Sequence, residues 1–387
     1  MTKVLEKSYI DYDIVIGGGG AAGLSLAYRL ANSAFSHLKI LIIEPDSKQG
    51  NDHTWCSWLE GEHIFDECAT TFYSNIIFKS KYLTKSYPIF PYRYRLISAD
   101  KFYNYVLEEI SNCDHISIKQ GKIESFEETA NCVQLKMEDQ TSYQCRQFFK
   151  CYIDHLPSTK DCLYVDQHFK GWWIETQGEE FETETCTLMD FKIDQAGEVR
   201  FMYVLPISKT KALVEVAIFS NNLLSQEAYD HILGKYIEDH LSLKQYHITE
   251  KEFGVIPMTD YDFKKYNTQK VIAIGSAGGA IKPSTGYAFS QIQVQCDYIV
   301  NCLNEGKEID MRKTKPLRQI MYDKTFLSVL LFGDVPGDKV FSDLFEKNKP
   351  QQIFKFLDER TNILEELKIM STCDIGLFTK ALIRIMK

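Results

Sequence analysis

A run of glycines near the N-terminus limits this chain to a small set of folds. The apolar segment 12–16 leads into the sequence GGGAAG at positions 18–23, which opens a helix-like segment. A strand, a glycine turn and a helix in that order form a cradle for a pyrophosphate, whose charge the free N–H groups and the dipole of the helix start stabilise. Gly18 permits the turn, Gly20 lets the backbone approach the phosphates, and Gly23 lets the helix pack against the strand.

An acidic residue at the expected spacing supports this interpretation. The apolar segment 38–43 predicts a second strand, which ends on Glu44, 21 residues after Gly23. A carboxylate there accepts hydrogen bonds from both hydroxyls of an adenosine ribose, so a phosphorylated ribose, as in NADP, is disfavoured at this position. The alternative is a glycine-rich turn in another kind of α/β protein, and the pairing with Glu44 favours the dinucleotide site.

Length, charge and cysteine usage exclude several classes of protein. A chain of 387 residues predicts about two domains. The formal net charge of -9 argues against a nucleic-acid-binding protein and against general attraction to anionic lipid. The 11 cysteines are scattered without a CxxC pair, which predicts a reducing, cytoplasmic compartment and no metal site. The charged segment 1–7 is unlike a signal peptide, and no apolar stretch is long enough to span a bilayer.

A second glycine-rich turn lies far along the chain. The apolar run 271–275 predicts a buried strand, and the residues that follow it include Gly278, Pro283 and Gly286, before a predicted helix from about 287 to 303. The N-terminus of that helix would stabilise negative charge on the pyrimidine end of a reduced flavin. An ordinary strand-to-helix connection is the alternative, although the clustering of glycines exceeds what such a connection needs.

Between the two turns the pattern changes to β. The segments 200–206 and 211–219 predict a hairpin, followed by a helix from about 225 to 240, and the last 80 or so residues look helical. We therefore expect an α/β fold: a doubly wound FAD-binding domain, Rossmann-like and of the glutathione-reductase type, with an inserted β-rich substrate domain and a helical C-terminal region. The expected boundaries are residues 1–75, 95–160 and 254–310 for the FAD-binding domain, 76–94 and 161–253 for the substrate domain, and 311–387 for the helical region.

Further motifs are spread over nearly the whole chain. They are DHTW at 52–55, YRLI at 94–97, QHFKGW at 167–172, LMDF at 188–191, YVLPIS at 203–208, ALVE at 212–215, GVIPM at 254–258, GSAGG at 275–279 and KPSTGY at 282–287. Together with the first glycine turn, this set resembles the lycopene cyclase family of FAD-dependent proteins, in particular its bacterial β-type members. The glycine motifs alone are shared with many flavoproteins, whereas the set together is specific.

The resemblance implies an isomerase that needs reduced FAD, with NAD(P)H as the expected electron source, and that catalyses no net redox reaction. The implied substrate is lycopene or a related linear carotenoid, whose ψ ends close into β-ionone rings. We therefore expect an enzyme on the inner face of the cell membrane. The residues expected to bind the cofactor are Gly18, Gly20, Gly23, Glu44, Arg95, Gly275, Gly278, Pro283 and Gly286.

The essential carboxylate of the family falls on Glu215, and the resemblance implies that it is the general acid. The plant branch carries a second acid at the next position, where this chain has Val216; Asp190 is our guess for a substitute partner. Burial in an apolar strand would keep Glu215 protonated by raising its pKa. The strand pattern alone favours an outward-facing glutamate in a salt bridge, because a period of two does not say which face is buried.

Aromatic side chains are the expected lining of the substrate pocket. A carbocation is stabilised by aromatic faces, by about 0.5–2 kcal/mol each. Trp55, Trp172 and Tyr203 are the candidates, and packing in the protein core is the alternative for each. Two C-terminal segments, 325–332 and 376–387, are candidates for contact with the membrane, and helices packed on their own domain are the equal alternative.

Two other functions are compatible with a flavoprotein fold. The first is an FAD-dependent oxidoreductase, a monooxygenase or an isoprenoid reductase, that acts on a hydrophobic substrate. The second is a catalytically silent FAD-binding protein that carries lipid. Many flavin hydroxylases have Asp after the glycine of the second turn, whereas this chain has Ser276 after Gly275, and this difference points away from the hydroxylases.

Overall fold

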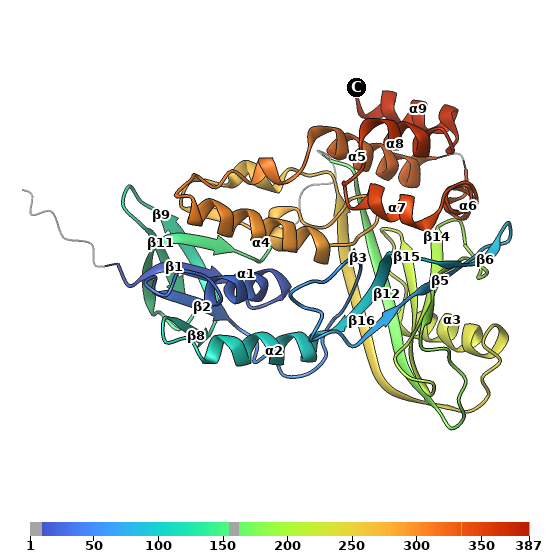
Figure 1. Ribbon diagram of the computed structural model, residues 1–387, viewed down its shortest axis with the longest axis horizontal. Coiled ribbons are helices and arrows are strands. Elements are labelled where there is room, and N and C mark those ends of the chain that lie inside the picture. Colours follow the sequence, from blue (N-terminus) through green and yellow to red (C-terminus); the bar gives the residue numbers. More distant parts are fainter. Residues whose placement is uncertain (1–9, 155–161, 334, 387) are drawn as a thin grey trace, which may run out of the picture.

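The computed structural model describes residues 10–154, 162–333 and 335–386, so the charged segment 1–7 lies outside the described residues. Three parts lie side by side in Figure 1: a sheet with helices α1, α2 and α4, a second sheet with α3, and a group of C-terminal helices. The chain starts in the first part and leaves it for the second sheet twice, at residues 75–88 and 164–259; it returns to the first part after each excursion and ends in the third part. The α/β class expected from the two glycine turns is confirmed.

The first sheet has the strand order β8-β2-β1-β11-β10-β9, with β17 paired to β11. The pairings of β1 with β2 and β11, of β2 with β8 and of β11 with β17 are parallel. Its strands are β1 (Tyr12–Gly17), β2 (Ile40–Glu44), β8 (Ile116–Gln120), β9 (Ile123–Glu128), β10 (Val133–Met137), β11 (Ser142–Lys150) and β17 (Val271–Ala273).

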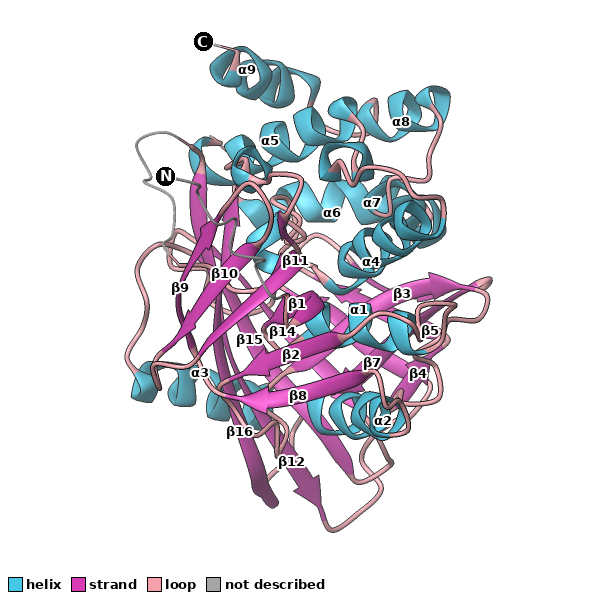
Figure 2. Cartoon of the chain, turned by 90° about the vertical axis from the view of Figure 1, so that its left-hand side faces the viewer, coloured by secondary structure: helices cyan, strands magenta, loops and turns pink. Residues whose placement is uncertain are grey.

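Three helices cover one face of the first sheet (Figure 2). The apolar side of each helix packs on the apolar side chains that the strands direct to that face. These helices are α1 (Ala21–Ala31), α2 (Ala99–Ser111) and α4 (Phe289–Asn304). Ile16 and Ile42 of the sheet share one buried cluster with Leu26, Phe102 and Ile292 of the helices. The predicted helices after the two glycine turns are therefore confirmed.

The second sheet has the order β16-β12-β15-β14-β13-β5-β6. Its strands are β5 (Asn75–Lys79), β6 (Thr84–Pro88), β12 (Tyr164–Thr176), β13 (Thr185–Asp190), β14 (Val199–Pro206), β15 (Lys211–Phe219) and β16 (Tyr246–Thr259). The predicted hairpin is β14 and β15. Strand β16 stays in the second sheet as far as Thr259, beyond the expected boundary at 254.

The two faces of the second sheet have different coverings. One face packs Val214 and Val216 of β15 under helix α3 (Gln226–Asp239). The other face packs Leu213 and Ala217 under the C-terminal helices and against a three-stranded sheet. That small sheet consists of β3 (Thr54–Glu60), β7 (Tyr92–Ser98) and β4 (Thr71–Tyr73).

The C-terminal region is helical, as predicted. It consists of α5 (Leu317–Phe332), α6 (Gly337–Lys347), α7 (Pro350–Leu357), α8 (Ile363–Met370) and α9 (Ile375–Ile385). Three short 3-10 turns complete the described elements: η1 (Phe263–Tyr266), η2 (Gly275–Gly278) and η3 (Met311–Thr314). Within the described residues, no helix combines the length and the hydrophobicity that a membrane crossing requires.

Candidate active site

The first glycine turn has the geometry of a pyrophosphate cradle. Gly18 has a φ of 116°, which favours glycine, and a Cβ on Gly23 would lie 1.9 Å from the carbonyl oxygen of Gly18. A Cβ on Gly20 would meet no atom within 4 Å, so the space beside the start of α1 is open. No described side chain caps α1, and its first N–H groups are available to an anion.

Glu44 lies at the edge of this cradle, where the ribose of a dinucleotide would lie. Its Oε2 accepts a hydrogen bond from the backbone N–H of Gly19 at 2.5 Å, and its Oε1 accepts one from Asp46 N–H at 3.0 Å. Lys48 Nζ is 3.5 Å from Oε1. These contacts orient the carboxylate beside the glycine turn, where it can accept further hydrogen bonds.

The second glycine turn abuts the first. A Cβ on Gly275 would lie 2.5 Å from Cβ of Ala22 in α1, so the turn directly contacts the helix start. The buried side chain of Gln295 in α4 holds the turn: its Oε1 accepts from Gly275 N–H at 2.8 Å and its Nε2 donates to the carbonyl of Gly278 at 3.0 Å. A dinucleotide held by the first turn can therefore extend along the second.

The second turn ends at a cavity of about 440 Å³. Ser276, Thr285 and Gly286 line it on one side. Gly286 has a φ of 75°, and a Cβ there would lie 1.8 Å from Oε1 of Gln167, a buried oxygen that has no hydrogen-bond partner among the described residues. The tight backbone and the unpartnered amide oxygen both fit a polar ring system inserted at this point.

The opposite wall of the cavity is the second sheet, and it carries Glu215. In the register of the sheet, Gly171 of β12 lies opposite Glu215 of β15 on one side and opposite Glu252 of β16 on the other. All three residues therefore point to the same face of the sheet. Because Gly171 has no side chain, the two carboxyl groups meet above it and form a hydrogen bond with each other.

The surroundings of this pair favour a protonated acid. Burial is the main cause that raises the pKa of Glu215 well above its ordinary value, and the charge and hydrogen bond of Glu252 add to it. Glu252 is buried; its Oε2 accepts a hydrogen bond from Thr54 Oγ1 at 2.7 Å, and its Oε1 accepts none from the described donor groups. The raised pKa of Glu215 therefore favours its protonated form.

A row of tyrosines continues the polar side of the cavity. Tyr203 of β14 lies directly opposite Glu215 in the register of the sheet. Its hydroxyl bonds to Tyr287, whose hydroxyl lies 2.7 Å from that of Tyr94. Burial raises the pKa of Tyr203, with further contributions from Tyr287 and Glu215, so its phenol stays neutral. The cavity thus offers neutral donors and aromatic faces next to the paired acids.

Two of the three aromatic residues predicted for the pocket line this cavity, namely Trp55 and Tyr203. Trp172 lies on the opposite face of the sheet, under α3, where its Nε1 donates to Asp230 Oδ1 at 3.2 Å. Asp190 also lies apart from Glu215. Its carboxylate accepts from Tyr236 Oη of α3 at 2.8 Å and lies 3.6 Å from Lys79 Nζ.

Arg95 and Pro283 do not line the cavity. The guanidinium of Arg95 is 2% exposed, and its Nη1 donates to Asp66 Oδ1 at 2.9 Å. It lies 5.4 Å from the ring centre of Phe289, which does line the cavity. Pro283 follows Lys282 in the second turn, just before the lining residue Thr285. Both residues therefore adjoin residues of the cavity wall without lining the cavity itself.

The sequence contains a weak signal for Glu252, which was not predicted. This residue lies two positions before Gly254 in the GVIPM motif, and both Gly171 and Glu252 adjoin recognisable motifs. Nothing in the local pattern shows that β12 pairs with β16 in the register that brings them together. That contact depends on residues about 80 positions apart in the chain.

Comparison with known proteins agrees with the motifs. The family model described as "Lycopene cyclase protein" matches residues 13–385, which is nearly the whole chain. This chain belongs to the lycopene cyclase family. Among its relatives, the chloroplastic lycopene beta cyclase of Nicotiana tabacum is 21% identical over 91% of this chain and 75% of its own length. The corresponding cyclase of Arabidopsis thaliana is 22% identical over 95% and 78%, and the chromoplastic capsanthin/capsorubin synthase of Citrus sinensis is 23% identical over 92% and 76%.

Solved structures show that this lycopene cyclase family member has a widely used fold. A geranylgeranyl bacteriochlorophyll reductase-like protein from Thermoplasma acidophilum superimposes with a TM-score of 0.65 at 13% identity, covering 97% of this chain and 99% of its own. A flavin-dependent halogenase from Xanthomonas campestris gives 0.59 at 13% identity, covering 97% and 94%. At this level of identity the likeness concerns the fold.

Proposed function

We propose that this protein is a lycopene beta-cyclase that uses reduced FAD without net redox change. The observation that carries the proposal is the pair of half-buried Glu215 and buried Glu252, beside a cavity bounded on its other side by the second glycine turn. Family membership supports the substrate class, a linear carotenoid such as lycopene.

The residues of both glycine turns fit FAD. The open space at Gly20 and the helix start would take the pyrophosphate, Glu44 the ribose, and the turn from Gly275 to Gly286 the ring system. When bound in its reduced form, the flavin supplies a fixed negative charge beside the cavity. NAD(P)H is the proposed electron source for its reduction.

Glu215 would begin the reaction by giving its proton to the terminal double bond of the polyene. The resulting tertiary cation is attacked by the neighbouring double bond, which forms the ring, and a proton is then lost from that ring to the carboxylate left on Glu215, which restores the acid. Protons and electrons balance, so the overall reaction is an isomerisation. Glu252 keeps the proton on Glu215 before the reaction, because ionising both acids in the same buried place is unfavourable.

The aromatic wall would protect and stabilise the cation. Trp55 and Tyr203 lie in the same cavity as Glu215, and aromatic faces stabilise a nearby cation by about 0.5–2 kcal/mol each. Exclusion of water matters equally because water would trap the cation as an alcohol. Since the substrate dissolves in lipid, we propose that the protein works at a membrane surface, on the inner face of the cell membrane.

The test is cyclisation of lycopene with dithionite-reduced FAD in the absence of NAD(P)H and oxygen. Many turnovers per flavin and a product with new β-ionone rings are expected. Consumption of one reductant per product would instead indicate an oxidoreductase. Glu215→Gln is expected to keep FAD bound and to lose activity at least about 1000-fold, since a general acid typically contributes a factor of about 100 to 10,000 to the rate. Full activity in that variant would refute the role of Glu215. Glu250→Gln, an exposed glutamate of the same strand as Glu252, is the matched control.

A further inference from the structure

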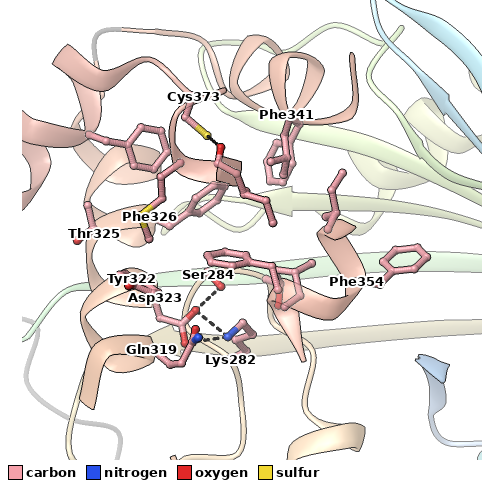
Figure 3. Close-up of a pocket in the computed structure, with 18 of the residues that line it drawn as sticks. Lys282, Ser284, Gln319, Tyr322, Asp323, Thr325, Phe326, Phe341, Phe354 and Cys373 are labelled. Carbon is pink, nitrogen blue, oxygen red and sulfur yellow. Dashed lines mark hydrogen bonds and ion pairs between the residues drawn. The ribbon is translucent and has the colours of Figure 1, made fainter. Parts of the chain in front are cut away.

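A second cavity, of about 460 Å³, lies between the second sheet and the C-terminal helices. We call it the C-terminal cavity. Figure 3 shows its wall, with Tyr322 and Phe326 of α5 on one side and Phe341 and Phe354 on the other. Most of the lining side chains are aromatic or aliphatic, so its contents must be mainly apolar.

The charged residues at its floor neutralise one another. Lys282 Nζ lies 3.0 Å from Asp323 Oδ1 and 3.1 Å from Glu359 Oε1, and Lys315 Nζ lies 2.5 Å from Asp323 Oδ2 and 3.1 Å from Glu359 Oε1. Ser284 Oγ donates to Asp323 at 2.6 Å (Figure 3). Two lysines and two carboxylates leave no net charge, and the cluster does not call for a charged ligand.

One end of the C-terminal cavity meets the cavity of Glu215. Thr285 and Tyr287 line both, so the two spaces adjoin at these residues. The ring of Tyr287 packs on Trp58 with 4.7 Å between ring centres, and Trp58 stacks on Phe354 at 4.9 Å. Aromatic side chains therefore lie at the junction of the two cavities.

The other end opens at the molecular surface. Leu367 of α8 and Ile375 and Leu382 of α9 line the C-terminal cavity, and they are nevertheless 57%, 66% and 39% exposed. Beside them, Leu364 and Met386 expose further apolar surface. A mouth of this kind suits a ligand that arrives from a lipid surface rather than from water.

From these four features we infer that the C-terminal cavity binds the distal part of a linear polyene while its terminal double bond lies at Glu215. The polyene enters through the mouth between α8 and α9. This inference rests on the proposed function for the identity of the polyene. It adds a binding site for the part of the substrate that lies beyond Tyr287 from Glu215.

The test fills the C-terminal cavity without touching the acid. Met370→Trp places an indole in its wall, and Leu382→Trp narrows its mouth at a partly exposed position that the fold tolerates. Leu223→Trp, at an exposed position that lines neither cavity, is the control. Each FAD-loaded protein is mixed with lycopene in phosphatidylcholine vesicles. After gel filtration, the bound polyene is read from its visible absorption per flavin, and turnover is measured in parallel with lycopene and with a half-length polyene that carries the same terminal group.

Both cavity variants are expected to retain at least tenfold less lycopene and to cyclise it at least tenfold more slowly, while they cyclise the half-length polyene as the control does. Undiminished binding of lycopene by both variants would overturn the inference, and so would equal loss of both substrates. Phospholipid retained by the wild type in place of polyene would also overturn it, because an acyl chain would then be the occupant. If polyene binds and the variants lose it, but no protein forms rings, the proposed function fails and the binding site stands.

Discussion

Replacing Glu252 by glutamine separates the two causes that raise the pKa of Glu215. The amide has nearly the same shape as the acid but carries no charge, so burial remains and the repulsion disappears. Strands β15 and β16 lie on either side of β12, and Gly171 between them lets the two carboxyl groups touch. In general, two unit charges in contact, about 4 Å apart, interact by about 4 kcal/mol at the effective dielectric constant typical near a protein surface.

This value is an upper limit because the cavity is open on one side and Glu215 is only half-buried there. We therefore expect Glu252→Gln to lower the pKa of Glu215, because the charge and the hydrogen bond of Glu252 both raise it. In the proposed reaction Glu215 must be protonated to act, so activity is present below its pKa and is lost above it. The alkaline limb of the pH profile should move to lower pH, and the rate at acid pH should be kept.

The assay is the initial rate of lycopene cyclisation with pre-reduced FAD, measured from about pH 5 to pH 9, the range in which a general acid with a raised pKa titrates. Glu250→Gln controls for the loss of one charge on β16. An alkaline limb that stays in place in Glu252→Gln would refute the coupling of the two acids. Loss of activity at every pH, with FAD still bound, would show instead that Glu252 reacts directly.

Three further outcomes are expected. Glu215→Gln should unfold at a higher temperature than the wild type above pH 5. The raised pKa of Glu215 lowers the stability of the folded wild type by about 1.4 kcal/mol for each pH unit between the unfolded and the folded pKa. The difference in unfolding temperature should vanish near pH 4, and its absence at pH 8 would contradict the raised pKa. Gly286→Ala should lose FAD binding, because Gly286 has a φ of 75° and the added Cβ would collide with the buried amide of Gln167. Binding is measured by equilibrium dialysis with flavin fluorescence as the readout. Asp323→Asn should destabilise the protein by about 3–5 kcal/mol in urea unfolding, because Lys282 and Lys315 would then share only Glu359. A loss below about 1 kcal/mol would contradict the importance of Asp323 in compensating the two lysines.

The cradle of the cofactor could be predicted from the sequence because it is a local structure. The turn from Gly18 to Gly23 depends on residues within a few positions of each other, and so does the turn that starts at Gly275. Their backbone conformations, and the helix that follows each, are the ones expected from the glycine spacing. The hairpin of β14 and β15 was predictable for the same reason, since its strands are adjacent in the chain.

The environment of Glu215 could not be predicted in this way. Alternation along a strand says which residues share a face, but not which face is covered by helix α3 and which by the cavity. For that reason Trp172 and Asp190, chosen for their chemistry, lie under α3 on the other side of the sheet.

The amino-acid sequence by itself determined the two glycine turns, the class of fold and, through its motifs, the family, and it pointed to Glu215 as the acid of the proposed reaction. Only the tertiary structure decided which second carboxyl group accompanies Glu215. Glu252 meets Glu215 because β16 and β15 pair with β12 in one particular register, and because the residue between them is Gly171. The register between distant strands is set by how each whole sheet packs against the helices and strands that cover it, so the sequence near either glutamate does not predict it.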